Sequence, residues 1–428
     1  MNDTQEKREL AVLAAVDTGA YDIDISIAEL RELAAAADID TFGVITQKRG
    51  ELDTATALGS GRVEELAQFV KNSEADMVIF DHELSPAQIR NLEEMCDCPV
   101  IDRTMLILSI FARRAVSSEG KLQVELAQLR YQLPRLAGRG VQLSRQGGGG
   151  GGGGGARRGA GETKIETDRR HIRRRITALE EDLKELTTRR ELRRLRRKKD
   201  NVTTVAIVGY TNVGKSTLLN TLTQAGVLAE DKLFATLDPT ARALILPDGR
   251  RVMLIDTVGL VRRLPHHLVE AFKSTLEEAV NADLILNVCD ITSPEMQEQL
   301  EVTRELLNSL GVEDTPMITV LNKCDLVEGN VDLLGERVVK TSARQGLGLE
   351  DLLLAIQKAL PTTHLRMHLL LPYSQGDLEA RIAATGKVFS RDYGPEGVEL
   401  DASVAVSVVP MVKEFVLPPK EQGYTQED

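Results

Sequence analysis

Residues 209–216 read Gly-Tyr-Thr-Asn-Val-Gly-Lys-Ser, the G-x-x-x-x-G-K-S spacing of a phosphate-binding loop. A strand-like apolar run at 205–208 precedes this loop, and a segment with helical spacing at 217–222 follows it. Backbone N–H groups of such a loop and of the following helix face phosphate oxygens, and glycines let that backbone approach closely. We expect Lys215 to bridge the β- and γ-phosphates and the Ser216 hydroxyl to ligate Mg²⁺.

A second motif, D-x-x-G at 256–259, ends a strand-like run at 252–255. We expect Asp256 to hold Mg²⁺ through water and the Gly259 N–H to bond the γ-phosphate. Between the two motifs lies Phe-Ala-Thr-Leu-Asp-Pro-Thr at 234–240. A threonine here should reach Mg²⁺ and the γ-phosphate in the GTP state, and Thr236 and Thr240 both qualify by position.

The third motif, N-K-x-D at 322–325, follows a strand-like run at 317–321. The Asp325 carboxylate can accept hydrogen bonds from both N1–H and N2–H₂ of guanine, whereas adenine offers no such donor pair. We expect Asn322 and Lys323 to brace the loop and the face of the base. Thr-Ser-Ala at 341–343 fits the loop whose backbone N–H meets guanine O6. Together the motifs predict a GTP-hydrolysing enzyme.

Two residues near the phosphates qualify this prediction. Leu260 occupies the position after Gly259, where Ras-like proteins carry the glutamine that orients the attacking water. Leucine cannot do so, and we therefore expect slow intrinsic hydrolysis that a partner, a cation or another residue completes. Asn212 matches an asparagine that helps to bind K⁺ in some small GTPases, although asparagine also suits a loop.

Composition limits the class of protein and its partners. The chain has 428 residues, 42% apolar and 3% aromatic, with no Trp. It has no apolar run of about 18 residues, the length of a transmembrane helix, and its N-terminus lacks a signal-peptide core. We interpret the four cysteines as reduced thiols of a cytoplasmic protein, with a membrane-associated fraction left open. Residues 120–200 carry a net charge of +12 and the rest −24, which predicts an acidic body with one basic arm for phosphate polymers.

The pattern of strands and helices predicts a multidomain α/β protein. Strand-like and helical segments alternate along 8–115, which favours a parallel sheet. The loops at 58–61 and 81–82 are candidate binding points, although we favour a structural role for them. Strand-like segments at 365–371 and 402–409 flank a helical one at 376–384, and the tail after 418 is expected to be disordered. We expect an N-terminal parallel α/β domain (1–117), an antiparallel helical hairpin (118–200), a Ras-like P-loop GTPase domain (201–362) and a small C-terminal α+β domain (363–428).

The predicted hairpin rests on two leucine-rich stripes with heptad steps. They are Leu122, Leu126, Leu129, Leu133 and Leu136, then Ile172, Ile176, Leu179, Leu183 and Leu186. Pro134 should kink or shorten the first helix. Nine glycines at 147–155 predict a flexible tip, which would carry Arg145, Arg157 and Arg158. Eight basic residues among 189–199 favour a phosphate-contacting surface over a merely solvated helix end.

These motifs resemble the HflX family of bacterial GTPases in the Obg–HflX group, over nearly the whole chain. The segments that carry the resemblance are 81–88 (DHELSPAQ), 100–104 (VIDRT), 120–129 (GKLQVELAQL), 161–170 (GETKIETDRR), 209–217, 234–240 and 256–259. Family hairpin loops are glycine-rich but mixed and end in R-G-P-G-E, whereas this chain has the nine-glycine run and ends in Arg-Gly-Ala-Gly-Glu at 158–162. That departure affects the expected conformation and contacts of the loop tip.

The resemblance implies a GTPase that binds the 50S subunit or the 70S ribosome; a monomer is our separate expectation, since the sequence does not determine the oligomeric state. Its N-terminal domain and hairpin would contact 23S rRNA near the peptidyl-transferase centre. The GTP state would split or rescue stalled ribosomes, and the ribosome would stimulate hydrolysis. Of the two candidate threonines, it favours Thr236, so that Ser216 and Thr236 ligate Mg²⁺. The sequence leaves open whether the N-terminal domain binds a second nucleotide.

The predicted site residues fall into two groups. Those with catalytic roles are Lys215, Ser216, Thr236 and Gly259. Those that contact the nucleotide are Gly209, Tyr210, Thr211, Asn212, Val213, Gly214, Lys215, Ser216, Thr217, Phe234, Ala235, Thr236, Leu237, Asp238, Asp256, Thr257, Val258, Gly259, Asn322, Lys323, Cys324, Asp325, Ser342, Ala343 and Arg344.

Two other functions fit some of the same features. One is a non-catalytic scaffold for rRNA binding or 50S assembly, in which the nucleotide only gates docking; Leu260 is compatible with it. The other is a GTPase that acts on a protein or membrane partner through the basic arm. The leucine stripes point inward within the predicted hairpin and leave little amphipathic surface for a bilayer, which disfavours this second alternative.

Overall fold

The computed structural model describes residues 8–138, 157–199, 202–224, 234, 239–263, 276, 278–312, 315–327, 337–361, 364–406 and 408–417. The chain divides into two compact units. Unit 1 comprises Met1–Arg196, Glu230–Pro239 and Val258–Leu276, and unit 2 comprises Arg197–Ala229, Thr240–Thr257 and Glu277–Asp428. The boundaries of the four domains expected from the sequence differ from those of these two units, and the four-domain division stays a prediction.

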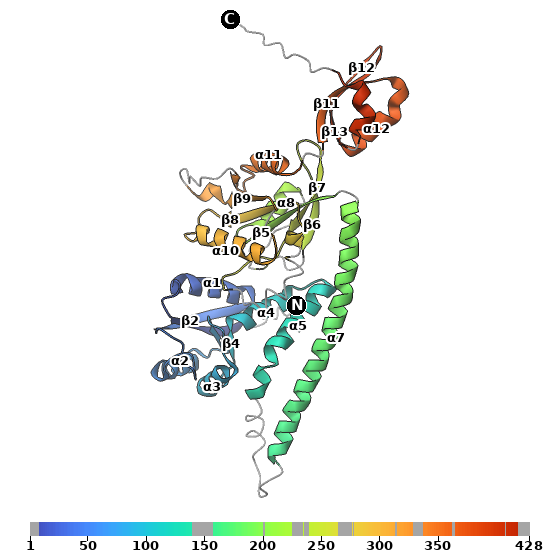
Figure 1. Ribbon diagram of the computed structural model, residues 1–428. Helices are drawn as coiled ribbons and strands as arrows, with labels where there is room; N and C mark the ends of the chain where they lie inside the picture. Colours follow the sequence, from blue (N-terminus) through green and yellow to red (C-terminus); the bar gives the residue numbers. More distant parts are fainter. Residues whose placement is uncertain are drawn as a thin grey trace, which may run out of the picture. The chain divides into compact units, whose positions relative to one another are not determined.

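Unit 1 begins with a four-stranded parallel sheet (Figure 1). Its strands, in the order β2-β1-β3-β4, are β1 (Glu9–Asp17), β2 (Ile39–Lys48), β3 (Met77–Phe80) and β4 (Val100–Asp102). The helices that alternate with them are α1 (Ile23–Ala36), α2 (Ser60–Ser73), α3 (Pro86–Cys96) and α4 (Arg103–Arg114). The predicted parallel α/β domain is therefore confirmed.

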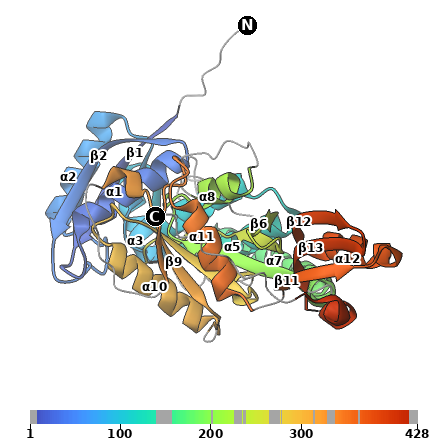
Figure 2. The same ribbon diagram turned by 90° about the horizontal axis from the view of Figure 1, so that it is seen from above.

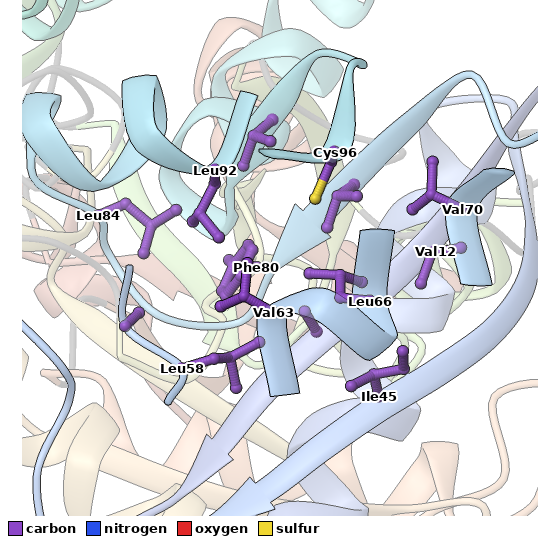
Figure 3. Close-up of a cluster of buried hydrophobic side chains, with 14 of the residues drawn as sticks. Val12, Ile45, Leu58, Val63, Leu66, Val70, Phe80, Leu84, Leu92 and Cys96 are labelled. Atoms are coloured by element: carbon purple, nitrogen blue, oxygen red, sulfur yellow. The ribbon is translucent and has the colours of Figure 1, made fainter. Parts of the chain in front are cut away.

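The core of this sheet explains why β1 is apolar without alternation. Val12 of β1 lies in a buried cluster with Leu66 of α2, Phe80 of β3 and Leu92 of α3 (Figure 3). Leu13, which points to the other face, is also fully buried. Helices thus cover both faces of the sheet, as the right-handed β–α–β connections of a parallel sheet require.

Local sequence fixes where two of these helices begin. The Ser85 hydroxyl oxygen accepts a hydrogen bond from the Gln88 N–H, and Gln88 Oε1 accepts one from the Ser85 N–H. This capping box, with Pro86 in the first turn, starts α3. Asp102 accepts from the Met105 N–H and starts α4. The 58–61 loop likewise starts a helix, because Gly59 is the residue before α2. We therefore assign this loop a structural role.

The helical hairpin consists of α5 (Ser118–Gln132), a 3-10 turn η1 (Arg135–Gly138) and the long α7 (Arg157–Lys199), which runs back along α5 (Figure 1). Helix α5 ends just before Pro134, as predicted. Ion pairs between described side chains join the two helices: Glu125 with Arg175, Arg130 with Glu180, and Glu119 with Arg190. The predicted antiparallel pairing is confirmed.

Two details of the hairpin differ from the sequence prediction. The most buried face of α5 is Gly120, Val124, Ala127 and Tyr131, whereas its leucines are only half-buried. This face also packs on α4, and small residues such as Gly120 and Ala127 give no hydrophobic signal in a sequence. Helix α7 begins at Arg157, so that 157–162 is not the loop tip we expected, although each of the two glycines there costs a helix roughly 1 kcal/mol relative to alanine. Arg145 and the glycines at 147–155 lie outside the described residues.

Unit 2 holds a six-stranded sheet, in the order β10-β9-β8-β5-β7-β6. All neighbours are parallel except β6 with β7. The strands are β5 (Thr203–Gly209), β6 (Thr240–Ile245), β7 (Arg251–Asp256), β8 (Leu284–Asp290), β9 (Met317–Asn322) and β10 (Val338–Lys340). The helical segments are α8 (Lys215–Leu222), α10 (Met296–Ser309), η2 (Cys324–Leu326) and α11 (Leu349–Ala359). Every strand predicted for this domain is present.

The C-terminal part of unit 2 is a three-stranded antiparallel sheet with a helix on it (Figure 2). Its elements are β11 (His364–Leu371), η3 (Tyr373–Gln375), α12 (Gly376–Thr385), β12 (Lys387–Gly394), β13 (Gly397–Ala405), α13 (Val409–Val412) and η4 (Lys413–Phe415). The α+β class is confirmed, but two elements were wrong. The strand expected at 402–409 ends at Ala405, and β12 was missed because an exposed edge strand needs no apolar alternation. The tail predicted after 418 lies outside the described residues.

Candidate nucleotide-binding site

The phosphate-binding loop connects β5 to α8 and depends on two glycines. Gly209 has φ +145, and a Cβ added there would lie 2.1 Å from the Val288 carbonyl oxygen of β8. Gly214 has φ +91, and its added Cβ would lie 2.4 Å from Asn322 Nδ2. Backbone conformation and space therefore both require glycine at these two positions.

Lys215 points into the curve of the loop. Its Nζ donates to the Gly209 carbonyl oxygen at 3.1 Å and to that of Tyr210 at 2.6 Å. Burial lowers the pKa of Lys215 to about 8, although the Asp256 carboxylate acts in the opposite direction. The buried ammonium is thus satisfied by carbonyl dipoles, and a bound phosphate would supply the negative charge that favours its protonated form.

Ser216 and Asp256 provide hard oxygen ligands side by side. The Ser216 hydroxyl donates to Asp256 Oδ2 at 2.7 Å, and Asp256 is 1% exposed at the end of β7. Strand pairing fixes this contact, because Asp256 lies opposite Ile207 of β5, and the Thr257 hydroxyl donates to the Ile207 carbonyl oxygen at 2.7 Å. A hydroxyl next to a carboxylate fits Mg²⁺, which prefers few protein oxygens and keeps several waters.

Asn322 joins three loops at the carboxyl edge of the sheet. Its Nδ2 donates to the Val213 carbonyl oxygen of the phosphate loop at 2.8 Å. Its Oδ1 accepts from the Ala343 N–H at 2.9 Å and from the Thr341 hydroxyl at 3.3 Å. Because Asn322 is 2% exposed, these bonds are shielded from water and fix the base-side loops against the phosphate loop.

The next residues of the N-K-x-D motif are more exposed. Lys323 has φ 65, and its Nζ lies 2.7 Å from Asp290 Oδ2 at the end of β8. Burial alone would raise the pKa of Asp290, but hydrogen bonds from Lys323 and Thr292 outweigh it and lower the pKa. Asp325 is half-buried, and its Oδ2 accepts from Gln345 Nε2 at 3.2 Å. A guanine could replace that exposed contact.

The predicted site residues of unit 2 therefore converge on one edge of its sheet. These are Gly209 to Thr217, Asp256 and Thr257, Asn322 to Asp325, and Ser342 to Arg344. Two further residues escaped the sequence prediction: Asp290, which holds Lys323, and Thr221, whose hydroxyl donates to the Ala343 carbonyl oxygen at 2.9 Å. An aspartate at the carboxyl end of a parallel strand was a usable signal for the first.

The predicted site residues at 234–238 and 258–259 belong to unit 1, whereas the other predicted site residues belong to unit 2. Phe234 belongs to unit 1, is 2% exposed and packs edge-on against Phe111, with ring centroids 4.5 Å apart. Val258, Gly259 and Leu260 also belong to unit 1. Ala235, Thr236, Leu237 and Asp238 lie outside the described residues, so the predicted Mg²⁺ ligand Thr236 stays a prediction.

The structure describes the two residues that bear on the expected rate of hydrolysis, Leu260 and Asn212. Leu260 is 5% exposed and presents only carbon atoms. Asn212 has φ 60, a left-handed conformation that asparagine tolerates better than most residues. This conformation gives Asn212 a structural reason to be present, alongside the expected K⁺ contact.

Family models match three consecutive parts of the chain. Residues 24–112 match "GTP-binding GTPase N-terminal", residues 114–197 match "GTP-binding GTPase Middle Region", and residues 204–323 match "50S ribosome-binding GTPase". The described helices include none long and apolar enough to cross a membrane.

Named relatives cover almost the full length. The GTPase HflX of Caldanaerobacter subterraneus subsp. tengcongensis is 49% identical over 97% of this chain and 96% of its own length. That of Escherichia coli K12 is 41% identical over 95% of each chain. A crystal structure of SsGBP with GDP is 26% identical, with a TM-score of 0.48, over 82% of this chain and 98% of that one. Phosphate loop, guanine motif and full-length identity agree, and the chain belongs to the HflX family of GTPases, enzymes that bind and hydrolyse GTP.

Proposed function

We propose that this GTPase associates with the 50S subunit or the 70S ribosome and uses its GTP-bound state to split or rescue stalled ribosomes. The N-terminal domain and the hairpin would contact 23S rRNA. The matched family description, 50S ribosome-binding GTPase, supports the partner. The observation that carries the proposal is the charge of the hairpin, +12 over residues 120–200 in a chain of net charge −12.

Side chains on α7 support an RNA-facing surface. Arg170, Arg173 and Arg174 are exposed, and residues 169–175 contain five arginines and no acidic residue. Arginine at such spacing contacts phosphates of a polyanion, and each contact releases counterions on binding. The basic residues at 193–199 extend the same helix, and their side chains lie outside the described residues.

The chemistry of the proposed site follows the roles of its residues. Lys215 and the backbone N–H groups of the loop would neutralise the β- and γ-phosphates, and Gly259 would bond the γ-phosphate. Mg²⁺ would be held by Ser216 and Thr236 directly and by Asp256 through water. The Asp325 carboxylate would select guanine. Leu260 offers no hydrogen bond to a water, so we infer that hydrolysis is slow in the free protein and stimulated by the ribosome.

Sucrose-gradient sedimentation with 50S subunits and 70S ribosomes tests the partner. We expect co-migration with a non-hydrolysable GTP analogue and less with GDP. Replacing Arg170, Arg173 and Arg174 by Gln should weaken binding and reduce the slope of log K against log salt by up to about 3, since each phosphate contact contributes about 0.9. Absence of co-migration in both nucleotide states would exclude this function.

A matched control removes three exposed charges elsewhere. Arg304, Lys358 and Arg381 lie outside the hairpin and outside the predicted site. Their replacement by Gln should leave ribosome binding near that of the wild type. An equal loss in both triple variants would show that net charge, and not the α7 surface, determines binding.

The scaffold alternative differs from the proposed function in whether 50S subunits change the rate of GTP turnover. A nucleotide-gated scaffold would bind 50S subunits but show the same GTP turnover with and without them. The proposed function expects the subunits to increase turnover. Single-turnover measurements at saturating 50S concentration distinguish these outcomes.

A role for K⁺ is a second proposal at the same site. We propose that the Asn212 side chain helps to hold K⁺ beside the phosphates. Asn212→Gly keeps the left-handed backbone without strain and removes the side chain. Hydrolysis should be faster in KCl than in equal NaCl for the wild type, and this difference should vanish in the variant. Equal rates in both salts for the wild type, with and without ribosomes, would leave backbone conformation as the reason for this asparagine.

A further inference from the structure

A cavity of about 180 Å³ lies in unit 1 between α3, β4, α4 and the α5–η1 end of the hairpin. Ile89, Val100, Met105 and Leu136 give it apolar walls, and polar groups that include Glu93 and Arg135 also line it. Pockets for drug-sized ligands measure roughly 300–1,000 Å³. The cavity therefore has room for one ring system and not for a whole nucleotide.

Arg135 and Tyr131 form a stacked pair in the cavity wall. The Arg135 Cζ lies 3.4 Å from the centroid of the Tyr131 ring. The guanidinium is held in place because it donates to the Tyr131 carbonyl oxygen at 2.8 Å and to the Leu84 carbonyl oxygen at 2.9 Å. Its Nε is buried and has no hydrogen-bond partner among the described residues. A buried N–H donor without an acceptor is costly, and a ligand acceptor would remove that cost.

The platform under this guanidinium is rigid. Tyr131 is 5% exposed and donates its hydroxyl hydrogen bond to Asp102, which is fully buried. Burial and the Asp102 carboxylate raise the pKa of Tyr131, so the phenol stays neutral. Asp102 also accepts from the Leu84 N–H at 3.1 Å and caps α4. Arg135 is also paired with Asp102, with 3.3 Å between its terminal nitrogen and Asp102 Oδ2, so the wall presents a planar guanidinium of fixed orientation whose charge is balanced by a buried carboxylate.

The charge of the sequence around Arg135 indicates which class of ligand carries the ring that the cavity would bind. Residues 126–161 contain no aspartate or glutamate and six arginines. Leu136 and Arg135, which line the cavity, lie within this stretch. A strand of nucleic acid would find counterions along this stretch of sequence.

We propose that this cavity takes a single unstacked base of an RNA strand, with its ring against the Arg135–Tyr131 pair. Proteins that read RNA commonly splay bases out of single-stranded loops and stack them on aromatic rings or arginine planes. Glu93 supplies an acceptor for the edge of the base, and the Arg135 Nε N–H, which lies in the plane of the guanidinium, is left for an acceptor of the strand beside the stacked ring. The inference rests on the proposed rRNA contact and deepens it by naming the groups that meet.

Photocrosslinking of the full chain to a decauridylate with one 4-thiouridine locates the base. We expect crosslinks in peptides that contain Met105 or residues 131–136. Ile89→Trp fills the cavity from α3 and should weaken decauridylate binding by on the order of tenfold, the usual effect of one lost base stack. Met95→Trp, on the exposed part of the same helix, is the matched control and should bind like the wild type.

A second pair of variants separates the planar group from its charge. Arg135→Lys keeps the charge and loses the plane, and should also bind decauridylate on the order of tenfold more weakly. Arg130→Lys, on the exposed hairpin surface, should not change binding. Thermal unfolding and GTP turnover check that each variant is folded, and both should match the wild type for Ile89→Trp.

Several outcomes would overturn the inference. Crosslinks confined to other peptides, or unchanged decauridylate binding in folded Ile89→Trp, would exclude a base in this cavity. Competition by uridine monophosphate at the same concentration as decauridylate would assign the cavity to free nucleotides. Normal RNA binding with reduced 50S co-sedimentation in Ile89→Trp would assign it to a protein side chain. Failure of the wild type to co-sediment would instead exclude the proposed function, while a crosslink at the cavity would still stand.

Discussion

Gly214→Ala is the smallest change that should break the nucleotide site. The added Cβ would lie 2.4 Å from Asn322 Nδ2, so the Asn322 side chain has to move. It cannot move without losing its hydrogen bond to the Val213 carbonyl oxygen and disturbing the one from the Ala343 N–H. One methyl group therefore acts on the phosphate loop and on the base-side loop together.

The expected cost has two parts. A left-handed conformation costs a non-glycine residue about 1–2 kcal/mol. Each buried hydrogen bond that loses its partner costs about 1–3 kcal/mol. Gly311 provides a control for the first part alone, because its φ is +88, close to the +91 of Gly214, and an added Cβ would meet nothing within 4 Å. Gly311→Ala should lose only the backbone part, and Gly214→Ala about 2–6 kcal/mol more through the two hydrogen bonds.

Urea unfolding of the nucleotide-free variants measures this difference, and titration with a fluorescent GDP analogue measures its effect on binding. A 2 kcal/mol loss in the binding-competent loop corresponds to a weakening of GDP binding by about 30-fold. Gly311→Ala should bind GDP like the wild type. If the two alanine variants unfold at the same urea concentration, and Gly214→Ala still binds GDP normally, the steric argument is wrong.

Two further predictions concern buried charges. The folded apo protein holds Lys215 at a pKa of about 8, below its ordinary 10.5, so the unfolded chain binds more protons between these values and stability should rise with pH there. Lys215→Met should remove that rise and stabilise the apo protein at pH 7 by on the order of 1–3 kcal/mol, measured by urea unfolding at several pH values. The same variant should no longer bind GTP. An unchanged dependence of stability on pH would contradict this reasoning. Burial would raise the pKa of Asp81, but Arg103 and Arg263 outweigh it and lower the pKa, so the stability it contributes should be lost only as pH falls below 3.8. Asp81→Asn should lower the free energy of unfolding by about 3–5 kcal/mol at pH 7 in the same assay. The free energy of unfolding of this variant should also fall less than that of the wild type as the pH drops below 3.8. A loss below about 1 kcal/mol at pH 7 would refute the pairing.

The phosphate loop and the parallel sheets could be predicted because their signals are local. An apolar strand, a glycine loop and a helix adjoin in sequence, and the Gly209 and Gly214 conformations show why no other residue fits. The guanine motif could be predicted for the same reason, since Asn322 and Asp325 directly follow β9.

Features that depend on contacts between distant segments could not be predicted. Asp290 ends β8 and meets Lys323 only because β8 and β9 are neighbours in the sheet. The buried face of α5 was missed since two of its four residues, Gly120 and Ala127, are small and carry little hydrophobic signal. Strand β12 was missed because its exposed edge position requires no apolar pattern.

Recognition of the base and orientation of the attacking water depend on different residues in this enzyme, which affects how a partner could act. Asn322 and Asp325 would hold the guanine side through contacts that are the same before and during bond cleavage, and such uniform binding lowers KM without raising kcat. Orientation of water is a contact that matters only in the transition state, and Leu260, an apolar side chain that is 5% exposed, cannot supply it. A ribosome that completes the site should therefore raise kcat with little change in KM for GTP. A partner that only tightened nucleotide binding would change KM alone, and single-turnover rates at saturating GTP would then be the same with and without it.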